Sequence, residues 1–278
     1  TKMNFRLKML VIMLIVALAT MAPVCVLSGG ESTTTTSTVT LAPGALVEVI
    51  GEYAEVRVHR VSSDTLDLKA TFHNSEFVDF YTQSLRPEPS DHFVISAKNG
   101  GSGSKSANSI IELGIPEGMQ LVVRTTNRPI SVDSAMLSTA SLITTDGKIS
   151  VTNASGDYDL STTNSEVIVQ SVDGNVNIST TNAHVWFDGV IDAGSSSIST
   201  TNGDVAVRLR NGSDVTVSGA THNGAVTVDG GNDGVTKNGD TATLEHQIKN
   251  GAATLNITNG PGAININPET IAVFDGDS

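Results

Sequence analysis

The sequence predicts an all-β protein that folds as a parallel β-solenoid (β-helix-like), with two strands in each coil of about 19 residues and an N-terminal β region that caps the stack. The main observation is a polar tripeptide, most often Thr-Thr-Asn, that recurs six times between residues 125 and 223. Its third residues are 19, 18, 18, 20 and 21 positions apart, and regular self-similarity of this length marks stacked supersecondary units. These third residues are Asn127, Asp146, Asn164, Asn182, Asn202 and Asn223.

A second observation is that each repeat divides into two halves with strand-like alternation. In the copy at residues 162–179, Val167 and Val169 alternate with residues that face the other way, and Val176 and Ile178 do so in the second half. Alternation with a period of two indicates a strand, and the Asn and Asp-Gly signals between the halves indicate turns. So short a strand buries too little apolar surface to offset its ordering entropy. Equivalent strands are therefore expected to stack in parallel.

An antiparallel meander would use the same turn signals, but it does not explain why the tripeptide recurs once for every two strands. We interpret the six corner residues as a structural ladder, because Asn and Asp tolerate the left-handed conformation and bond to nearby backbone. Stacked Thr and Asn side chains also form hydrogen-bonded ladders. A flat Thr array that binds ice or crystalline glycan is the less favoured alternative, since adjacent residues of a strand point to opposite faces.

The composition fits a thin, valine-rich stack. Aromatic residues make up only 4% of the 278 residues, and glycine, which tight corners need, occurs 26 times. The net charge of −13 argues against a nucleic-acid partner, because binding to phosphates requires Lys and Arg. The single cysteine, Cys25, excludes a disulfide within the chain.

Residues 1–28 are expected to be a signal peptide or a membrane or lipid anchor. Lys2, Arg6 and Lys8 precede an uncharged apolar run at residues 9–22, which is the pattern of an export leader. Three outcomes stay open: a cleaved signal peptide, an uncleaved anchor, or lipidation at Cys25, whose surrounding box lacks the usual Leu three residues earlier. All three predict an exported chain, secreted or facing the cell surface or periplasm, which contacts the membrane only through this leader.

The remaining chain divides into four segments by composition and patterning. Residues 29–45 are predicted to be a Thr-rich linker, because they are small, polar and of low complexity. Residues 46–123 are predicted to form a cap of four to six β-strands, since an open solenoid end exposes apolar columns and strand edges. The solenoid repeats follow at residues 124–228, and residues 229–278 are predicted to form terminal coils and a tail.

Three stretches carry a resemblance to a known family. They are residues 55–74, residues 110–127 with an Ile-Pro-Glu-Gly turn, and the repeats that continue to Val228. Together they resemble the DUF4097 family of bacterial β-strand-repeat proteins, over roughly residues 46–266. The resemblance implies an exported β-solenoid without an established catalytic site, and the family's adhesin designation is itself a prediction. Arg128 and His222 depart from the family pattern.

Four side chains are candidates for surface contacts. His184 and Trp186 alternate with apolar residues, so both are expected to project outward, and an exposed Trp can stack on a sugar ring. Arg208 and Arg210 are expected to lie outward near Asp204 and Asp214. There they would neutralise part of the acidic surface or, alternatively, contact a glycan acid or a phosphate.

No pattern in the sequence predicts catalysis, a cofactor or a metal site. Asp157 and Asp159 have a spacing that could serve acid–base work, but solvated acidic strands look the same. The loop with Asp229, Asn232, Asp233 and Asp240 offers oxygen ligands, yet it lacks the frame of a calcium loop.

The sequence therefore favours a non-catalytic cell-envelope β-repeat protein, an adhesin or a surface interaction scaffold. Its expected partner is a surface, a glycan or an envelope protein. A carbohydrate-binding or carbohydrate-active β-helix protein and an envelope-sensing accessory protein are the alternatives.

Overall fold

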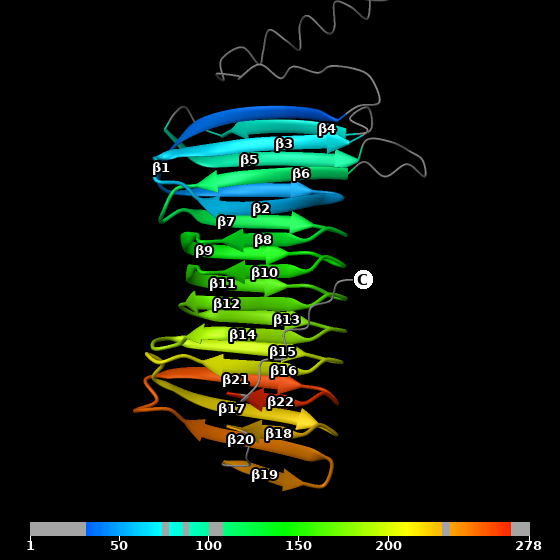
Figure 1. Cartoon of the computed structure of the whole chain (residues 1–278), viewed down its shortest axis with the longest axis vertical. Coiled ribbons are helices and arrows are strands. Elements are labelled where there is room, and N and C mark those ends of the chain that lie inside the picture. Colours follow the sequence, from blue (N-terminus) through cyan, green and yellow to red (C-terminus); the bar gives the residue numbers. More distant parts are fainter. Residues whose placement is uncertain (1–31, 74–77, 86–88, 100–107, 230–233, 268–278) are drawn as a thin grey trace, which may run out of the picture.

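Two columns of β-strands run along the length of the computed structural model (Figure 1). The structure describes residues 32–73, 78–85, 89–99, 108–229 and 234–267. The expected leader with Cys25 lies outside these residues. Over the described ranges, no helix is long and apolar enough to cross a membrane.

Each coil contributes one strand to each column. The first column contains, in spatial order, β4 (Val78–Ser84), β5 (Ser90–Asn99), the second half of β1 (Thr33–Gly51), β7 (Gln120–Thr125), β9 (Met136–Ile143), β11 (Ser155–Ser161), β13 (Val176–Thr180), β15 (Ser195–Thr200), β21 (Ala253–Asn259), β17 (Val215–His222), β20 (Thr241–Gln247) and β19 (Val235–Asn238).

The second column begins with the first half of β1. It continues with β3 (Thr65–His73), β6 (Asn108–Ile115), β2 (Ala54–Arg60), β8 (Ile130–Asp133), β10 (Ile149–Thr152), β12 (Val167–Asp173), β14 (Val185–Val190), β16 (Val205–Leu209), β22 (Ile264–Ile266) and β18 (Val226–Val228).

The strands of the repeat region pair in parallel and in the register that the period predicts. Val169 lies opposite Val151 of the preceding coil and Phe187 of the following one, so equivalent residues stack along the column. This arrangement confirms the all-β, parallel solenoid-like fold with two strands per coil. It excludes the antiparallel meander for these residues.

The core is a continuous filling of side chains between the two columns. Val167 and Val169 are fully buried, whereas Ile168 between them faces outward and is half-buried. Tyr158 and Phe187 are the largest of the fully buried side chains. Each buried Val, Ile or Leu contributes about 1.5–3 kcal/mol, and stacking adds these contributions along the column.

In four of the six corner tripeptides, those that begin at Thr144, Thr162, Thr180 and Thr200, a buried threonine precedes an exposed one. Thr162 is buried, and its hydroxyl donates to the carbonyl oxygens of Thr145 and Gly147, each at 3.3 Å. The next residue, Thr163, is exposed, and its backbone N–H donates to the carbonyl of Thr145 at 3.0 Å. The buried hydroxyl thus finds its partners in the neighbouring corner, as buried polar groups require.

The Thr-rich segment is not a linker from residue 33 onward, and this prediction was wrong. β1 begins at Thr33 and runs antiparallel to β3, with Thr33 opposite Phe72 and Thr40 opposite Thr65. β-Branched threonine fits a pleated strand well, and buried Val39 anchors this strand to the core. Low complexity therefore did not indicate a linker over residues 33–45.

The N-terminal end combines a parallel coil with closing strands. The coil formed by the second half of β1 and by β2 lies between β5/β6 and β7/β8, so that Val49 is in register with both Ile95 and Val123. β3 and β4 run antiparallel to β6 and β5. Parallel stacking thus begins within the segment predicted as a cap, and β3, β4 and the first half of β1 close the end.

The last coil of the chain does not lie at the end of the stack (Figure 1). β21 lies between β15 and β17, with Ile257 opposite Ile198 on one side and Gly219 on the other. β22 lies likewise between β16 and β18. The prediction that residues after 229 form the terminal coils was therefore wrong for β21 and β22, which lie inside the stack. In this inner position both edges of β21 are paired. Antiparallel β20 covers the edge of β17, and β19 in turn covers the edge of β20.

We expect Gly203→Ala to destabilise the fold by about 1–3 kcal/mol. A methyl group at this position would lie 1.9 Å from the carbonyl oxygen of Ala183, so the backbone of one coil would have to move. Chemical denaturation of both proteins measures the loss. Gly219→Ala is the control, because its nearest contact, Leu244 Cβ, is 3.4 Å away. Equal losses of unfolding free energy in the two variants would contradict the close backbone approach at Gly203.

Candidate binding site on the outer face of β14 and β16

The structure brings the four predicted contact residues to one outer face of the second column. β14 and β16 are parallel neighbours, and Trp186 of β14 is in register with Ile168 of β12 and Ala206 of β16. Trp186 faces outward but is half-buried between these two neighbours, whereas the sequence predicted an exposed ring. These three side chains form a small apolar strip on an otherwise polar surface.

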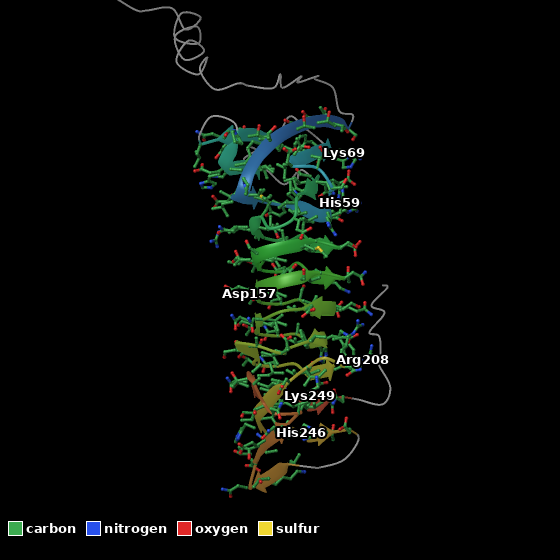
Figure 2. The ribbon with its side chains drawn as sticks, turned by 90° about the vertical axis from the view of Figure 1, so that its left-hand side faces the viewer. His59, Lys69, Asp157, Arg208, His246 and Lys249 are labelled. Carbon is green, nitrogen blue, oxygen red and sulfur yellow. The ribbon has the colours of Figure 1, made fainter. Side chains whose placement is uncertain are left out.

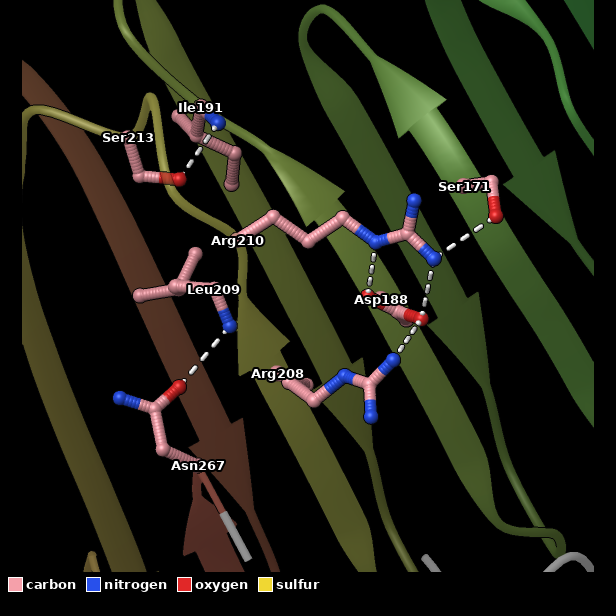
Figure 3. A network of polar contacts seen from close by, with 8 residues as sticks. All are labelled: Ser171, Asp188, Ile191, Arg208, Leu209, Arg210, Ser213 and Asn267. Atoms are coloured by element: carbon pink, nitrogen blue, oxygen red, sulfur yellow. Dashed lines mark hydrogen bonds and ion pairs between the residues drawn. The ribbon is translucent and has the colours of Figure 1, made fainter.

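Next to this strip, a buried carboxylate holds two guanidinium groups (Figure 3). Arg210 binds Asp188 with two hydrogen bonds, from Nε to Oδ1 at 2.7 Å and from Nη2 to Oδ2 at 2.9 Å. Arg208 donates from Nη2 to Oδ2 at 2.9 Å, and Arg210 Nη2 also donates to Ser171 Oγ at 2.8 Å. The carboxylate is fully covered, whereas the side chains of Arg208 and Arg210 are 38% and 39% exposed. The network fixes both guanidiniums at the surface.

Asp204 and Asp214, which were expected near the arginines, make their hydrogen bonds elsewhere. Asp204 accepts a hydrogen bond from the backbone N–H of Ala263 at 2.7 Å, and Asp214 accepts from the backbone N–H groups of Asn250 and Ala252. Both carboxylates therefore stabilise the coil formed by β21 and β22. The sequence alone did not show that this coil would lie beside them.

Asp188 should make the free energy of unfolding depend on pH. Burial alone would raise the pKa of Asp188, but hydrogen bonds and charges from Arg210 and Arg208 outweigh burial and hold that pKa below its usual value. A carboxyl with a lowered native pKa stabilises the fold above its unfolded pKa, about 3.9, and this contribution is lost as the pH falls through the native pKa.

We therefore expect Asp188→Asn to lower the melting temperature at about pH 6 and to lose this difference from wild type as the pH falls well below 4. Thermal melts across this range measure the difference. Asp159→Asn removes the same charge from the other column and serves as the control. A difference from wild type that stays constant down to about pH 2 would contradict the role given to Asp188.

His184 lies at the edge of this face and bridges two coils. Its Nδ1 accepts a hydrogen bond from the backbone N–H of Asp204 at 2.9 Å. The same nitrogen lies 3.6 Å from Asp204 Oδ2, but because Nδ1 accepts the backbone hydrogen bond it has no hydrogen to donate to that carboxylate. Lys148 and Glu166 form the corresponding contact between earlier coils, at 2.6 Å.

The corner residues form a hydrogen-bonded ladder over five coils. Asn164 donates to Asp146 at 2.6 Å, and the next two steps, Asn182 to Asn164 and Asn202 to Asn182, are each 2.8 Å. With its amide turned to donate, Asn127 lies 2.8 Å from Asp146 Oδ2.

Asn223 does not belong to this ladder, contrary to the prediction. The coil formed by β21 and β22, called the inserted coil below, separates Asn223 from Asn202. The residue opposite Thr200 is Asn259. The backbone N–H of Asn223 bonds instead to the carbonyl of Asp240 at 2.6 Å.

A shallow groove of about 320 Å³ lies on the outer face of the first column. Figure 2 shows Asp157, which lines it, and Arg208 on opposite sides of the stack. Asn175 Nδ2 donates to Asp157 Oδ1 at 3.1 Å, so one of the two predicted carboxylates is engaged in the wall. The other polar lining residues include Gln120, Thr139, Asp159 and Asn177.

No group of three or more metal-ligating side chains gathers among the residues that the structure describes. Of the loop that runs from Asp229 to Asp240, Asn232 and Asp233 lie outside the described residues. The outer face of β14 and β16 presents an indole ring, two guanidinium groups and the hydroxyl of Ser171.

Sequence reasoning missed Asp188 and Ser171. A signal for Asp188 was present, because the coil between Asn182 and Asn202 spans 20 residues and the same step leads from Asp188 to Arg208. Ser171 lies in a bulge of β12, with a φ of 57°, and alternation does not predict such an irregularity.

The fold defines a class, a parallel β-solenoid with antiparallel strands at its ends. No protein-family model and no curated protein matches the chain.

Several solved structures are similar in shape at low identity. A "putative cell adhesion protein" from Clostridium sporogenes is 15% identical with a TM-score of 0.39, and the match covers 85% of this chain and 100% of that one. A "putative adhesin" from Bacteroides fragilis is 9% identical with a TM-score of 0.39, over 85% and 98% of the two chains. One from Parabacteroides merdae is 11% identical with a TM-score of 0.31, over 84% and 95%. At such identities and TM-scores the matches assign no function to this chain.

Proposed function

We propose that this chain is a non-catalytic, exported β-repeat protein of the bacterial cell envelope, and that it acts as an adhesin or surface interaction scaffold. The observation that carries the proposal is the gathering of Trp186, Arg208 and Arg210 on one outer face of a rigid stack. Aromatic and arginine side chains dominate recognition surfaces. Stacked coils hold these side chains in place without any cost of ordering a loop on binding.

Export and family membership form part of the same proposal. The charged and then apolar pattern of residues 1–22 supports export, and the segments at 55–74 and 110–127 support membership of the DUF4097 family. Residues 55–74 include most of β2 and all of β3, and residues 110–127 include most of β6 and all of β7; β2 and β6 are parallel neighbours, as stacked repeats require.

A binding screen of the purified full chain tests the function. The chain is passed over immobilised glycans, matrix proteins and envelope proteins, and released material is analysed for cleavage products. We expect retention by at least one class without turnover, and at least tenfold weaker retention of Trp186→Ala, which loses about 1.4 kcal/mol or more of stacking. The variant should keep the wild-type melting temperature, since Trp186 lies outside the core.

Two outcomes would overturn the proposal. Retention by no surface at all would remove the scaffold function. Release of shortened glycans by the wild type would favour the carbohydrate-active alternative, for which the carboxylates of the groove on the first column, Asp157 and Asp159, would be the residues to test next.

A further inference from the structure

The guanidinium groups of Arg208 and Arg210 retain binding capacity after their bonds to Asp188. Arg208 uses only Nη2, and Arg210 uses Nε and Nη2. Within the described residues, Nη1 of each arginine makes no hydrogen bond, and both side chains are more than one-third exposed. Each arginine therefore presents unused N–H donors to solvent.

The charge at this position is opposite to that of the molecule as a whole. Two guanidiniums share one carboxylate, which leaves one positive charge in a chain with a net charge of −13. Because Asp188 is fully buried and bound by both arginines, it cannot turn away to make room for other contacts. An incoming anion would meet fixed donors, and the guanidinium fork that Arg208 keeps open matches the planar geometry of a carboxylate.

The apolar strip lies directly beside these donors. Arg208 is two residues beyond Ala206, the residue in register with Trp186, so Arg208 and Trp186 point outward from adjacent strands. Strand spacing and rise place their backbones about 8 Å apart. A sugar ring stacked on the indole could therefore carry a carboxylate to the guanidiniums.

We propose that the outer face of β14 and β16 binds an acidic saccharide, with the sugar ring on Trp186 and its carboxylate at the free donors of Arg208 and Arg210. This inference rests on the proposed surface-binding function and names its ligand class. The hydroxyl of Ser171, which accepts from Arg210 at 2.8 Å, lies at the far side of the network and helps to fix the second guanidinium.

The test measures binding of the full chain to three probes at physiological salt: oligogalacturonate, which carries carboxylates, dextran sulfate, which carries sulfates, and neutral dextran. We expect affinity for oligogalacturonate to be the highest. Arg208→Gln should weaken it about tenfold to hundredfold, the effect of losing a charged hydrogen bond, and Trp186→Ala at least tenfold. Arg208→Lys keeps the charge but loses the fork, so it should recover only part of the affinity.

Lys148→Gln is the matched control, because it removes one cation from the same column without touching this network. Equal weakening by Lys148→Gln and Arg208→Gln would show general charge attraction and overturn the proposal, and so would preference for dextran sulfate or for neutral dextran. If all three probes fail while a protein surface retains the chain, the ligand class is wrong and the proposed function stands. If nothing retains the chain, the proposed function itself fails. Melting temperatures of all variants separate loss of binding from loss of fold.

Discussion

Val205→Asp is expected to unfold the C-terminal half of the stack. Val205 is fully buried on β16, opposite Val185 on one side and Ile264 on the other. A carboxylate there has no partner in an apolar column, and the cost should reach about 4 kcal/mol or more. Because coils are stable only through their neighbours, the damage should spread along the column and not stay at one residue.

Circular dichroism and thermal melts measure the loss. Ala206→Asp is the matched control, since the next residue of the same strand faces outward and is half-buried. We expect a melting temperature close to wild type for the control and a large loss of β signal for Val205→Asp. Native signal and melting temperature in Val205→Asp would contradict the inward register of β16.

Introducing two aspartates into the core face of β21 should separate the C-terminal strands of the stack from the rest. Leu255 and Ile257 of β21 are buried, and β21 pairs with both β15 and β17. Leu255→Asp with Ile257→Asp should expel this strand and break the contact between the two halves of the first column. We expect amide protection to be lost over β17, β20 and β19 and to persist over β7 to β11.

Hydrogen exchange of the full chain measures this effect strand by strand. Asn256→Asp with Thr258→Asp adds the same charge to the exposed face of β21 and is the control. Unchanged protection of β17 in the core variant would mean that β17 can stack directly on β15. The inserted coil would then be an addition to the stack and not a part that holds it together.

The candidate site was predictable to a different extent for each residue. Alternation predicted that Trp186 and Arg208 face outward, because a strand of known register fixes the direction of every side chain. The bonds that join Arg208 and Arg210 to Asp188 depend on which coils are neighbours and on a bulge at Ser171, and a period does not contain this information. The bonds of Asp204 and Asp214 to backbone N–H groups beside β21 and β22 depend on the order of the coils in the same way.

The sequence by itself determined the coil: its length, its two strands, its buried valines and its Thr-Thr-Asn corner. These features are local, since alternation and turn chemistry act over a few residues. Only the tertiary structure decided the order of the coils, which places β21 and β22 before β17 and β18, and the use of the Thr-rich segment as a strand. Every coil presents similar apolar columns and similar hydrogen-bonding edges, so many stacking orders satisfy the pattern equally well. In the observed order, β21 and β22 are each paired with a parallel strand on both edges.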